Sequence, residues 1–243
     1  MQCFKADLHI HSCLSPCADL TMTPNTVASR LMELGIDWAS ITDHNTARNV
    51  RVFSQVWEKN GIRCLPGLEV QTIEDVHILC YLPDLSIAER FGLWVESYLP
   101  SMEFDPEQYG YPLLVDENDQ FIKTVDKPFF LPVSLELNQV VHELEKVGGI
   151  GVYAHIDRSM GVIEQLGFLP PDPSGVGCEI YQQSKIPQYK PATQGRPLLS
   201  SSDAHHPDAM VEAKMIIRCK SRSFEEFRLA FFGIRERSIR LCI

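Results

Sequence analysis

The sequence predicts a mixed α/β fold built as a single domain over residues 1–243. Short apolar runs of strand length alternate along the chain with longer segments in which apolar residues recur at helical spacing. Apolar residues make up 44% of the chain and charged residues 22%, which is typical of a globular protein with one sizeable core. Strands and helices that alternate in this way favour a layered α/β architecture.

The predicted strands are short apolar runs of the length that strands usually have. In chain order they are Phe4–Leu8, Trp38–Thr42, Ile62–Val70, Val76–Leu82, Ile150–Ala154, Gly177–Ile180, Leu198–Ser201 and Met215–Arg218. The closing segment, Ser238–Ile243, is either a final strand or an interface edge, and its sequence does not choose between the two.

The predicted helices carry start and stop signals at their ends. The first follows Thr23 with a proline at its first position and stops before Gly35, and the third stops at Gly148. Thr46 and Ser223 are the expected N-caps of two others. In chain order the four helices are Pro24–Leu34, the segment from Thr46 to about Lys59, Leu137–Val147, and the segment from Ser223 to about Phe232.

Between Pro83 and Val133 the alternation of strands and helices breaks down. This stretch is rich in aromatic and acidic residues and is punctuated by Pro100, Pro106, Pro112, Pro128 and Pro132. Irregular segments of this length in compact domains are often functional, so residues 83–133 are predicted to form an insertion or lid. The alternative is an irregular connection with no chemical role.

The charge balance restricts the partners that the chain would bind. Lys and Arg total 22 against 32 Asp and Glu, which gives a net charge of −10. Such a chain is a poor general binder of nucleic-acid backbones or anionic membranes, although a bound cluster of cations would reverse this locally. No signal peptide and no run of roughly 20 apolar residues is present, so we expect a cytoplasmic protein without a membrane partner.

The eight cysteines form no Cys-x-x-Cys pair, and in a chain without an export signal they are expected to be reduced. Cys13 and Cys17 lie close to a pair of histidines and are therefore candidate metal ligands. Nitrogen and oxygen donors are more abundant nearby, so the sequence favours those donors over thiolate.

The histidines and certain acids carry the chemical signal. His9 and His11 are two residues apart at the end of the first predicted strand, so both side chains face the same side. Asp203 and His205 have the same spacing after another apolar run. His44, Glu69, His77 and His155 also lie in or just after predicted strands, where parallel α/β folds place their active sites. Buried histidines and acids at this density would be destabilising without a cation, which predicts a metal centre.

The chain resembles the polymerase and histidinol phosphatase (PHP) superfamily through an ordered series of motifs. They are His9-Ile10-His11, Thr42-Asp43-His44, Gly67-Leu68-Glu69, His77, Ala154-His155 and Ser202-Asp203-Ala204-His205. The resemblance covers nearly the whole chain apart from residues 83–133. It implies a distorted (β/α)7 TIM-like barrel of the PHP type with a trinuclear metal centre at its C-terminal mouth.

The resemblance also implies a ligand set for three divalent ions. The first ion would be held by His9, His11, Glu69 and Asp203; the second by Glu69, His77 and His155; the third by Asp19, His44 and His205. The position of Asp19 departs from the family's pattern, because the loop Ser15-Pro16-Cys17-Ala18 lengthens the approach to it.

Mixed imidazole and carboxylate ligands suit Zn, Mn or Fe, and adjacent metal ions suit in-line displacement at phosphorus. The predicted function is therefore a metal-dependent phosphoesterase that hydrolyses a small phosphorylated metabolite or nucleotide by metal-activated water. The expected partner is a small phosphorylated substrate.

Several polar residues near the ligands are candidate catalytic groups. Asp43 either orients a ligand imidazole or makes a plain structural hydrogen bond, and His206 is a candidate general acid. Arg158 is the favoured anchor for phosphate oxygens, because a guanidinium can grip them through two parallel hydrogen bonds. Arg48 and Lys185 are the other candidate anchors, and the alternative for each of the three is an ordinary solvated charge.

Two alternative functions remain open at this point. A nuclease or nucleotide phosphodiesterase would share the metal chemistry, but the net charge and the acidic insertion make nucleic acid an unlikely partner by this reasoning. A metal-binding regulatory module without turnover is the other alternative, and the complete ligand set argues against it. His142 lies inside a predicted helix and is expected to lie outside the site.

Overall fold

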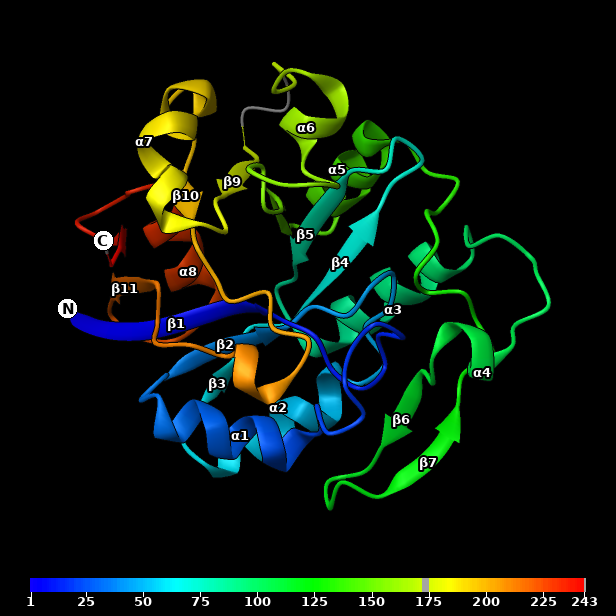
Figure 1. Ribbon diagram of the computed structural model, residues 1–243. Helices are drawn as coiled ribbons and strands as arrows, with labels where there is room; N and C mark the ends of the chain where they lie inside the picture. Colours follow the sequence, from blue (N-terminus) through cyan, green and yellow to red (C-terminus); the bar gives the residue numbers. More distant parts are fainter. Residues whose placement is uncertain (172–174, 243) are drawn as a thin grey trace.

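The computed structural model describes residues 1–171 and 175–242. It has the mixed α/β architecture expected from the sequence, with strands paired into two five-stranded sheets and a separate two-stranded sheet. Helices pack on the outside of the two large sheets (Figure 1). Among the described residues, no helix combines the length and apolar character needed to cross a membrane.

The first large sheet has the strand order β12-β11-β1-β2-β3. Its strands β1 and β2 are parallel, with Ala6 opposite Trp38, and a register shift follows Asp7. Strand β11 is antiparallel to both β1 and β12. The strands are β1 (Gln2–Ile10), β2 (Trp38–Ile41), β3 (Arg63–Cys64), β11 (Met215–Cys219) and β12 (Ser238–Leu241). The C-terminal segment thus forms an edge strand of this sheet.

The second large sheet has the order β10-β9-β8-β5-β4. Strand β5 is antiparallel to β4 and β8, whereas β8, β9 and β10 are parallel. Two isolated bridges join the sheets, one between Ile10 and Ala204 and the other between His44 and Glu69. The strands are β4 (Gly67–Gln71), β5 (His77–Tyr81), β8 (Ile150–Tyr153), β9 (Gly177–Glu179) and β10 (Leu198–Leu199).

The strand pairing differs from that of a regular (β/α) barrel, in which all strands are parallel. Four of the strand pairs in the two large sheets are antiparallel. The two bridges bring the sheets together at the carboxyl ends of β1 and β2, but continuous pairing does not run from one sheet into the other in the described residues. The closed seven-stranded barrel stays a prediction.

The helices follow the sequence signals closely. Helix α1 has Pro24 in its first turn, and the indole of Trp57 in α2 donates a hydrogen bond of 3.2 Å to the carbonyl of Pro24, which ties the two helices together. Both helices cover the same side of the first sheet (Figure 1). The helices are α1 (Pro24–Glu33), α2 (Val50–Lys59), α3 (Leu85–Glu96), α4 (Pro106–Tyr109), α5 (Leu137–Lys146), α6 (Val162–Leu166), α7 (Ile186–Tyr189) and α8 (Phe224–Phe231).

Two predicted elements differ from the structure for local reasons. The helix expected from Thr46 begins at Val50, because the Thr46 hydroxyl donates to the buried carboxylate of Glu96 at 2.7 Å instead of capping the helix. The strand expected over Ile62–Val70 is divided into β3 and β4, with Leu65 and Pro66 between them. A proline cannot donate to a strand ladder, which explains the break.

The segment 83–133 begins with an ordinary packed helix, α3, which buries Ala88, Phe91 and Val95. It continues through α4 into a hairpin of β6 (Leu113–Val115) and β7 (Phe121–Thr124), which projects from one side of the molecule (Figure 1). Asn45 ties the end of the segment to the body, because its side-chain amide donates to the carbonyls of Phe129 and Leu131, each at 2.9 Å. The role as a lid stays a prediction.

Candidate metal centre

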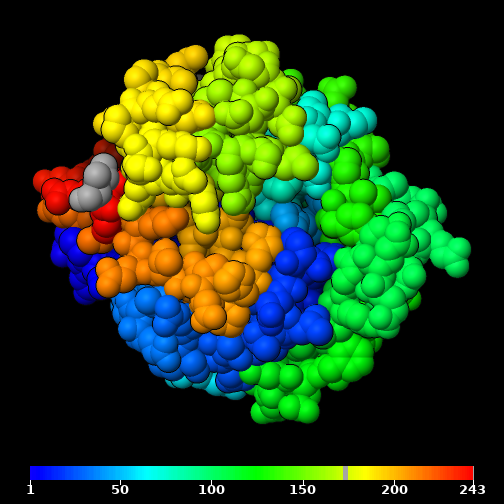
Figure 2. Space-filling model, viewed as in Figure 1, coloured from blue at the N-terminus to red at the C-terminus, as the bar shows by residue number. Residues whose placement is uncertain are grey.

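The structure brings together eight of the nine metal ligands implied by the resemblance. We call them the donor cluster, and all but the partly exposed His205 are buried. They come from the carboxyl ends of β1 and β2, from β4 and β5, and from the segments after β8 and β10. Figure 2 shows the surface hollowed where the dark blue loop after β1, the yellow-green segment after β8 and the orange segment after β10 meet. The donor cluster consists of His9, His11, His44, Glu69, His77, His155, Asp203 and His205.

His9 in β1 and His11, which directly follows this strand, point the same ring nitrogen into the cluster, with His9 Nε2 and His11 Nε2 only 3.2 Å apart. His9 Nδ1 lies 2.8 Å from Glu179, whose carboxylate can only accept, so Nδ1 carries a proton. His11 Nδ1 lies 3.1 Å from the hydroxyl of Ser15. Each Nδ1 thus has a partner outside the cluster, and the Nε2 atoms are left to face the carboxylates of Glu69 and Asp203.

Glu69 is the centre of the cluster. The antiparallel pairing of β4 and β5 puts Gln71 opposite His77, so Glu69 and His77 are diagonal neighbours on one face. Burial raises the pKa of the Glu69 carboxyl, but His77, His9 and His44 outweigh it and hold the pKa well below its ordinary value. The carboxylate oxygens lie within 3.0–3.4 Å of ring nitrogens of His9, His11, His44, His77 and His155. One carboxylate shared in this way is the arrangement that a bridging metal ligand needs.

Two residues of the cluster have strained backbones. His155 and Asp203 have φ of 29° and 52°, in the left-handed region that residues other than glycine rarely adopt. The backbone N–H of His155 donates to Glu179 at 3.2 Å, and Asp7 accepts from the backbone N–H of Ser202 at 3.0 Å, which holds both turns in place. Strain of this kind costs about 1–3 kcal/mol per residue and is concentrated at functional sites.

The imidazoles of the cluster divide into two electrostatic classes. Burial alone would lower the pKa of His9, but Glu179 and Glu69 raise it to about 10. Burial likewise opposes charge on His44, whereas Cys17 and Glu69 raise its pKa to about 10. For His77 and His205 burial prevails and lowers each pKa to about 4. Protons and metal ions therefore compete for His9 and His44, because a metal binds the neutral ring.

The donor set fits divalent metal ions. Three groups have their donor atoms within 4.8 Å of one another: His11, His44 and His205; His9, His11 and Glu69; and His44, Glu69 and His77. Among the described residues, several buried nitrogen and oxygen atoms that could bind a metal lack a hydrogen-bond partner. Burying such atoms is energetically costly unless a cation or a water molecule contacts them. These donors are His44 Nδ1, Glu69 Oε2, His77 Nε2, His155 Nδ1 and Asp203 Oδ1.

Asp43 is fully buried and acts on the cluster through two serines. It accepts hydrogen bonds from the backbone N–H and the hydroxyl of Ser12, at 2.7 and 2.6 Å, and from the Ser15 hydroxyl at 2.7 Å. Because the proton of Ser15 is donated to Asp43, the Ser15 oxygen accepts from His11 Nδ1. Asp43 is therefore placed to fix the ring of His11 indirectly, across the loop that follows β1.

Of the three candidate phosphate anchors, Arg158 is the one placed at the cluster. Its guanidinium pairs with Asp203 and lies 4.5 Å from the ring centre of Tyr181. Arg48 is instead committed to Glu96, with contacts of 2.8 and 2.6 Å. Lys185 donates to a backbone carbonyl, that of Asp157, at 2.8 Å.

Three other polar residues lie outside the donor cluster. Asp19 is exposed, and its carboxylate accepts from the backbone N–H and hydroxyl of Thr21 at 2.8 and 2.6 Å. His206 is exposed at the start of a 3-10 turn, so its role as a general acid stays a prediction. His142 is exposed on α5, away from the ligands as expected.

Two functional candidates were missed or set aside by the sequence reasoning. Glu179 lies in β9 and contacts both His9 and His155. The sequence signal that could have identified it is an acidic residue inside an apolar strand, because such residues are rarely buried without a partner. Cys17, set aside as a candidate ligand, lies in the loop that follows β1. Burial would raise the pKa of this thiol, but His44 and His205 lower it to about 5.

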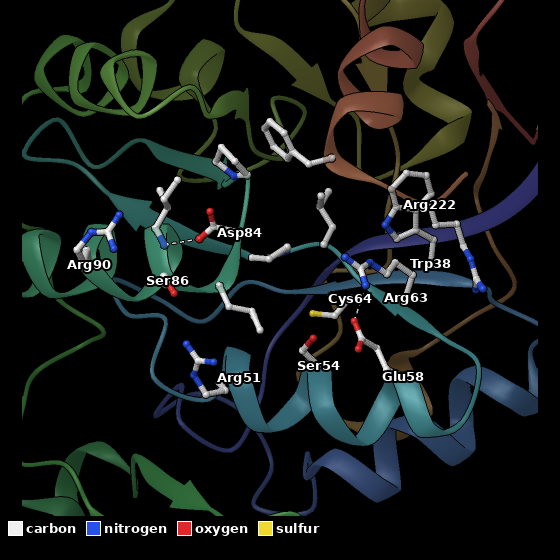
Figure 3. A pocket seen from close by; sticks show the side chains of 16 residues that line it. Trp38, Arg51, Ser54, Glu58, Arg63, Cys64, Asp84, Ser86, Arg90 and Arg222 are labelled. Carbon is white, nitrogen blue, oxygen red and sulfur yellow. Dashed lines mark hydrogen bonds and ion pairs between the residues drawn. The ribbon is translucent and has the colours of Figure 1, made fainter. Parts of the chain in front are cut away.

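A cavity of about 480 Å³ lies at the end of β2 that is opposite the donor cluster (Figure 3). Trp38, which lines it, begins β2, whereas His44 follows the end of that strand. Four arginines line this cavity, and three of them pair with a carboxylate or donate to backbone carbonyls: Arg51, Arg63 and Arg222. The arginines are Arg51, Arg63, Arg90 and Arg222. The chemistry of the molecule is therefore concentrated at the donor cluster.

A cluster of imidazoles and carboxylates at strand ends is the donor set of a site for divalent metal ions. The PHP domain model matches residues 7–158, more than half of the sequence. The chain belongs to the PHP domain family, and the resemblance seen in its motifs is thereby confirmed. No curated protein matches the chain.

Solved structures show the same fold. The lesion-specific endonuclease PfuEndoQ from Pyrococcus furiosus is 20% identical, with a TM-score of 0.67 over 98% of this chain and 58% of that one. Endonuclease Q in complex with a 27-mer duplex carrying an abasic lesion is 19% identical, with a TM-score of 0.64 and the same coverage. A two-domain protein from Bacteroides vulgatus that contains a predicted PHP-like metal-dependent phosphoesterase is 17% identical, with a TM-score of 0.57 over 99% of this chain and 65% of that one. The chain thus spans less than two thirds of each of these proteins.

These similarities contradict one prediction from the sequence, that the partner is a small phosphorylated substrate and that nucleic acid is unlikely. Endonuclease Q has this fold and acts on DNA with an abasic lesion. The net charge of −10 misled because it sums the whole chain, whereas acids such as Asp119 and Asp116 are used structurally. Asp119 accepts from Asn25 at 2.9 and 3.0 Å, and Asp116 accepts from its own turn. Local charge at the site decides which substrate binds.

Proposed function

We propose that the chain is a metal-dependent hydrolase that cleaves phosphodiester bonds in nucleic acid. The observation that carries the proposal is the convergence of eight predicted ligands, Glu69 and seven others, in one cluster, with five buried donor atoms that lack a hydrogen-bond partner in the described residues. Such a cluster is too costly to bury for structure alone. The fold that it shares with Endonuclease Q supports nucleic acid as the substrate class.

The residues divide into overlapping ligand groups for up to three ions, with Zn, Mn and Fe suited to the donors. Glu69 would bridge two ions, since its oxygens face imidazoles on both sides. When bound, the ions would supply Lewis-acid stabilisation of charge on the phosphate. The first group is His9, His11, Glu69 and Asp203; the second is Glu69, His77 and His155; the third contains His44 and His205.

The chain's own residues set the orientation of the substrate and of the ligands. Arg158 lies at the rim with 36% of its side chain exposed, so its guanidinium can exchange Asp203 for a phosphate oxygen. Tyr181 supports it from one side, and Lys214, which donates to the carbonyls of Tyr181 and Ser201 at 2.9 Å, lies 4.5 Å from the same ring. Arg158 at the rim is therefore the group suited to a phosphate oxygen of the backbone. Glu179 and Ser15 hold the tautomers of His9 and His11.

The test uses the full chain, stripped with a chelator and reloaded separately with Mn²⁺, Zn²⁺ or Fe²⁺. Labelled single-stranded DNA, duplex DNA and duplex DNA with one abasic site are the substrates, beside bis(p-nitrophenyl) phosphate and its monoester. Asp203→Asn removes a ligand, and Glu89→Gln is the matched control because Glu89 pairs with Arg51 on the surface. We expect metal-dependent diester cleavage by the parent and by Glu89→Gln, and at least a hundredfold loss in Asp203→Asn.

Two results would overturn the proposal. If metal-loaded protein releases phosphate from the monoester and leaves every diester intact, the substrate class is wrong. If metal binds at full stoichiometry and no ester is cleaved, the alternative of a metal-binding regulatory module is correct. DNA binding would be measured in the same samples over a series of salt concentrations. An affinity for DNA that rises on metal loading and falls with salt would support contacts to the phosphates of the substrate.

A further inference from the structure

Three aromatic side chains of the insertion pack against one another at its surface. The rings of Tyr109 and Phe130 are stacked, with centres 5.0 Å apart and an angle of 21° between their planes. The ring centre of Phe104 lies 6.1 Å from that of Tyr109 and 6.4 Å from that of Phe130. All three side chains are partly exposed, and the hydrophobic cores of the described residues do not include them. We call Phe104, Tyr109 and Phe130 the aromatic platform.

The core of the insertion is formed by other residues. Phe129 is fully buried and packs with Leu14 and Val125 in a small core of its own. Phe130, the next residue, lies outside that core although its ring is equally large. Aromatic rings that cluster at a surface and stay open to solvent are typical of binding sites, because a ligand can cover their faces. The aromatic platform is therefore a candidate binding surface.

One end of the aromatic platform is held next to a predicted metal ligand. Asn45 directly follows His44 in the chain. Its side-chain amide donates to the carbonyls of Phe129 and Leu131, each at 2.9 Å. These carbonyls flank Phe130 on both sides, so the backbone of Phe130 is fixed beside the donor cluster.

The other end is held against the loop that follows β1. Gly110 is the residue after Tyr109, and a Cβ at Gly110 would overlap the carbonyl of Pro16 in that loop. Ser15, the neighbour of Pro16, has its hydroxyl 3.1 Å from His11 Nδ1. In Figure 2 the green spheres of the insertion adjoin the dark blue spheres of this loop. The aromatic platform thus lies at the margin of the metal centre.

The acids beside the aromatic platform are held within the insertion. The carboxylate of Asp105 accepts from the backbone N–H of Glu107 at 3.0 Å, at the start of α4. The carboxylate of Glu107 accepts from the hydroxyl of Tyr111. The platform itself offers uncharged rings, so it does not suit a phosphate. It suits the flat face of a nucleobase, because any of the bases can stack on an aromatic side chain.

We propose that the aromatic platform stacks an unpaired base of the nucleic-acid substrate while a neighbouring phosphate of the same strand lies at the donor cluster. The inference rests on the proposed function, because it assumes that the substrate is nucleic acid. Inside a duplex both faces of a base are covered by its neighbours, so only a base in a single strand, or one turned out of a duplex, offers a free face. The substrate class is therefore nucleic acid with an unstacked base close to the cleaved bond.

The first experiment compares two diesters with the same leaving group, cleaved by the full chain loaded with Mn²⁺. One is the p-nitrophenyl ester of thymidine monophosphate, which carries a base, and the other is methyl p-nitrophenyl phosphate, which carries none. Phe130→Ala should lower the ratio of kcat/KM for the first ester to that for the second by about 5- to 150-fold, the effect of one base stack. Phe130→Trp should keep the ratio of the parent, because it keeps an aromatic face. Phe121→Ala is the matched control, since Phe121 is 60% exposed on β7 and outside the platform.

The second experiment needs no turnover. A single strand with phosphorothioate linkages, which resist cleavage, carries the fluorescent base aminopurine, whose emission falls when it stacks. We expect quenching on binding to the parent and to Phe121→Ala, and its loss with Phe130→Ala at saturating protein. Urea titration guards against a folding defect: Phe130→Ala should unfold near the midpoint of the parent, whereas Phe129→Ala should unfold at clearly lower urea. Tyr109→Ala, which removes the other ring of the stack, is the test variant where Phe130→Ala unfolds.

The two proposals fail in different ways. Quenching that depends on Phe130, without cleavage of any diester, would refute the proposed function alone. Diester cleavage whose ratio, like the quenching, is unchanged in both Phe130→Ala and Tyr109→Ala would refute this inference alone. A parent that neither quenches the strand nor cleaves a diester would refute both.

Discussion

Glu179→Gln should weaken metal binding although Glu179 is outside the ligand set. The carboxylate is buried, lies 2.8 Å from His9 Nδ1 and accepts from the backbone of His155 at 3.2 Å. Burial opposes its charge, but His9 overcomes this and lowers the pKa of Glu179 to about 2, which marks a strong charge-assisted contact. The amide keeps the shape and removes the charge.

The magnitude follows from the two contacts. A hydrogen bond to a charged group contributes about 1.5–3 kcal/mol, and loss of a partner that orients a ligand imidazole typically costs about 10- to 100-fold in metal affinity. Competition with a chromogenic chelator at fixed pH would measure the affinity, and circular dichroism would confirm the fold. Glu89→Gln is the control, since Glu89 is a half-exposed partner of Arg51. An affinity within twofold of the parent would refute the idea that Glu179 fixes His9.

Three further predictions concern stability. Phe227→Ala should lower the free energy of unfolding by about 3–5 kcal/mol in urea titrations, because Phe227 is fully buried, whereas Phe121→Ala at a 60% exposed position should change it little. Glu96→Gln should cost about 1–3 kcal/mol at neutral pH. Burial raises the pKa of Glu96, but Arg48 and Thr46 lower it below its ordinary 4.5, so this stability is present above that pH and is lost as the pH falls through the lowered value. A pH-independent cost would contradict this reasoning. Gly110→Ala should cost about 1–3 kcal/mol by thermal denaturation, because φ at Gly110 is +91° and a Cβ would meet the carbonyl of Pro16; unchanged stability would show that the loop yields.

Much of the fold and of the cluster could be predicted because both depend on regular spacing. The period of two along a strand puts His9 and His11 on one side, and the carboxyl ends of strands lie where donors from distant segments meet. The antiparallel pairing of β11 with β1 could not be predicted, because an alternation of strands and helices does not encode the direction of a neighbour. The same limit applies to the closure of the barrel.

The parts of the site that escaped prediction depend on contacts between distant residues. Asp19 was expected as a ligand, but its carboxylate accepts hydrogen bonds from Thr21 in the loop that follows β1, and a loop has no periodicity from which this could be predicted. Arg48 follows His44 closely and was a candidate anchor, but its partner Glu96 is 48 residues away. The net charge of the whole chain also contained no information on position, because it counted acids such as Asp119, which accepts hydrogen bonds from Asn25 in α1.

The position of Asn45 has a mechanical consequence for access to the site. Its amide group holds the segment around Phe129 and Leu131, while its oxygen accepts from the backbone of Gln71 in β4 at 2.9 Å. Because Asn45 directly follows His44, this end of the insertion cannot swing outward without disturbing two ligand-bearing segments. The hairpin of β6 and β7 is held separately, because Asn25 in α1 donates to Asp119 at 2.9 and 3.0 Å. The margin of the opening beside His44 would therefore keep its shape when the rest of the insertion moves.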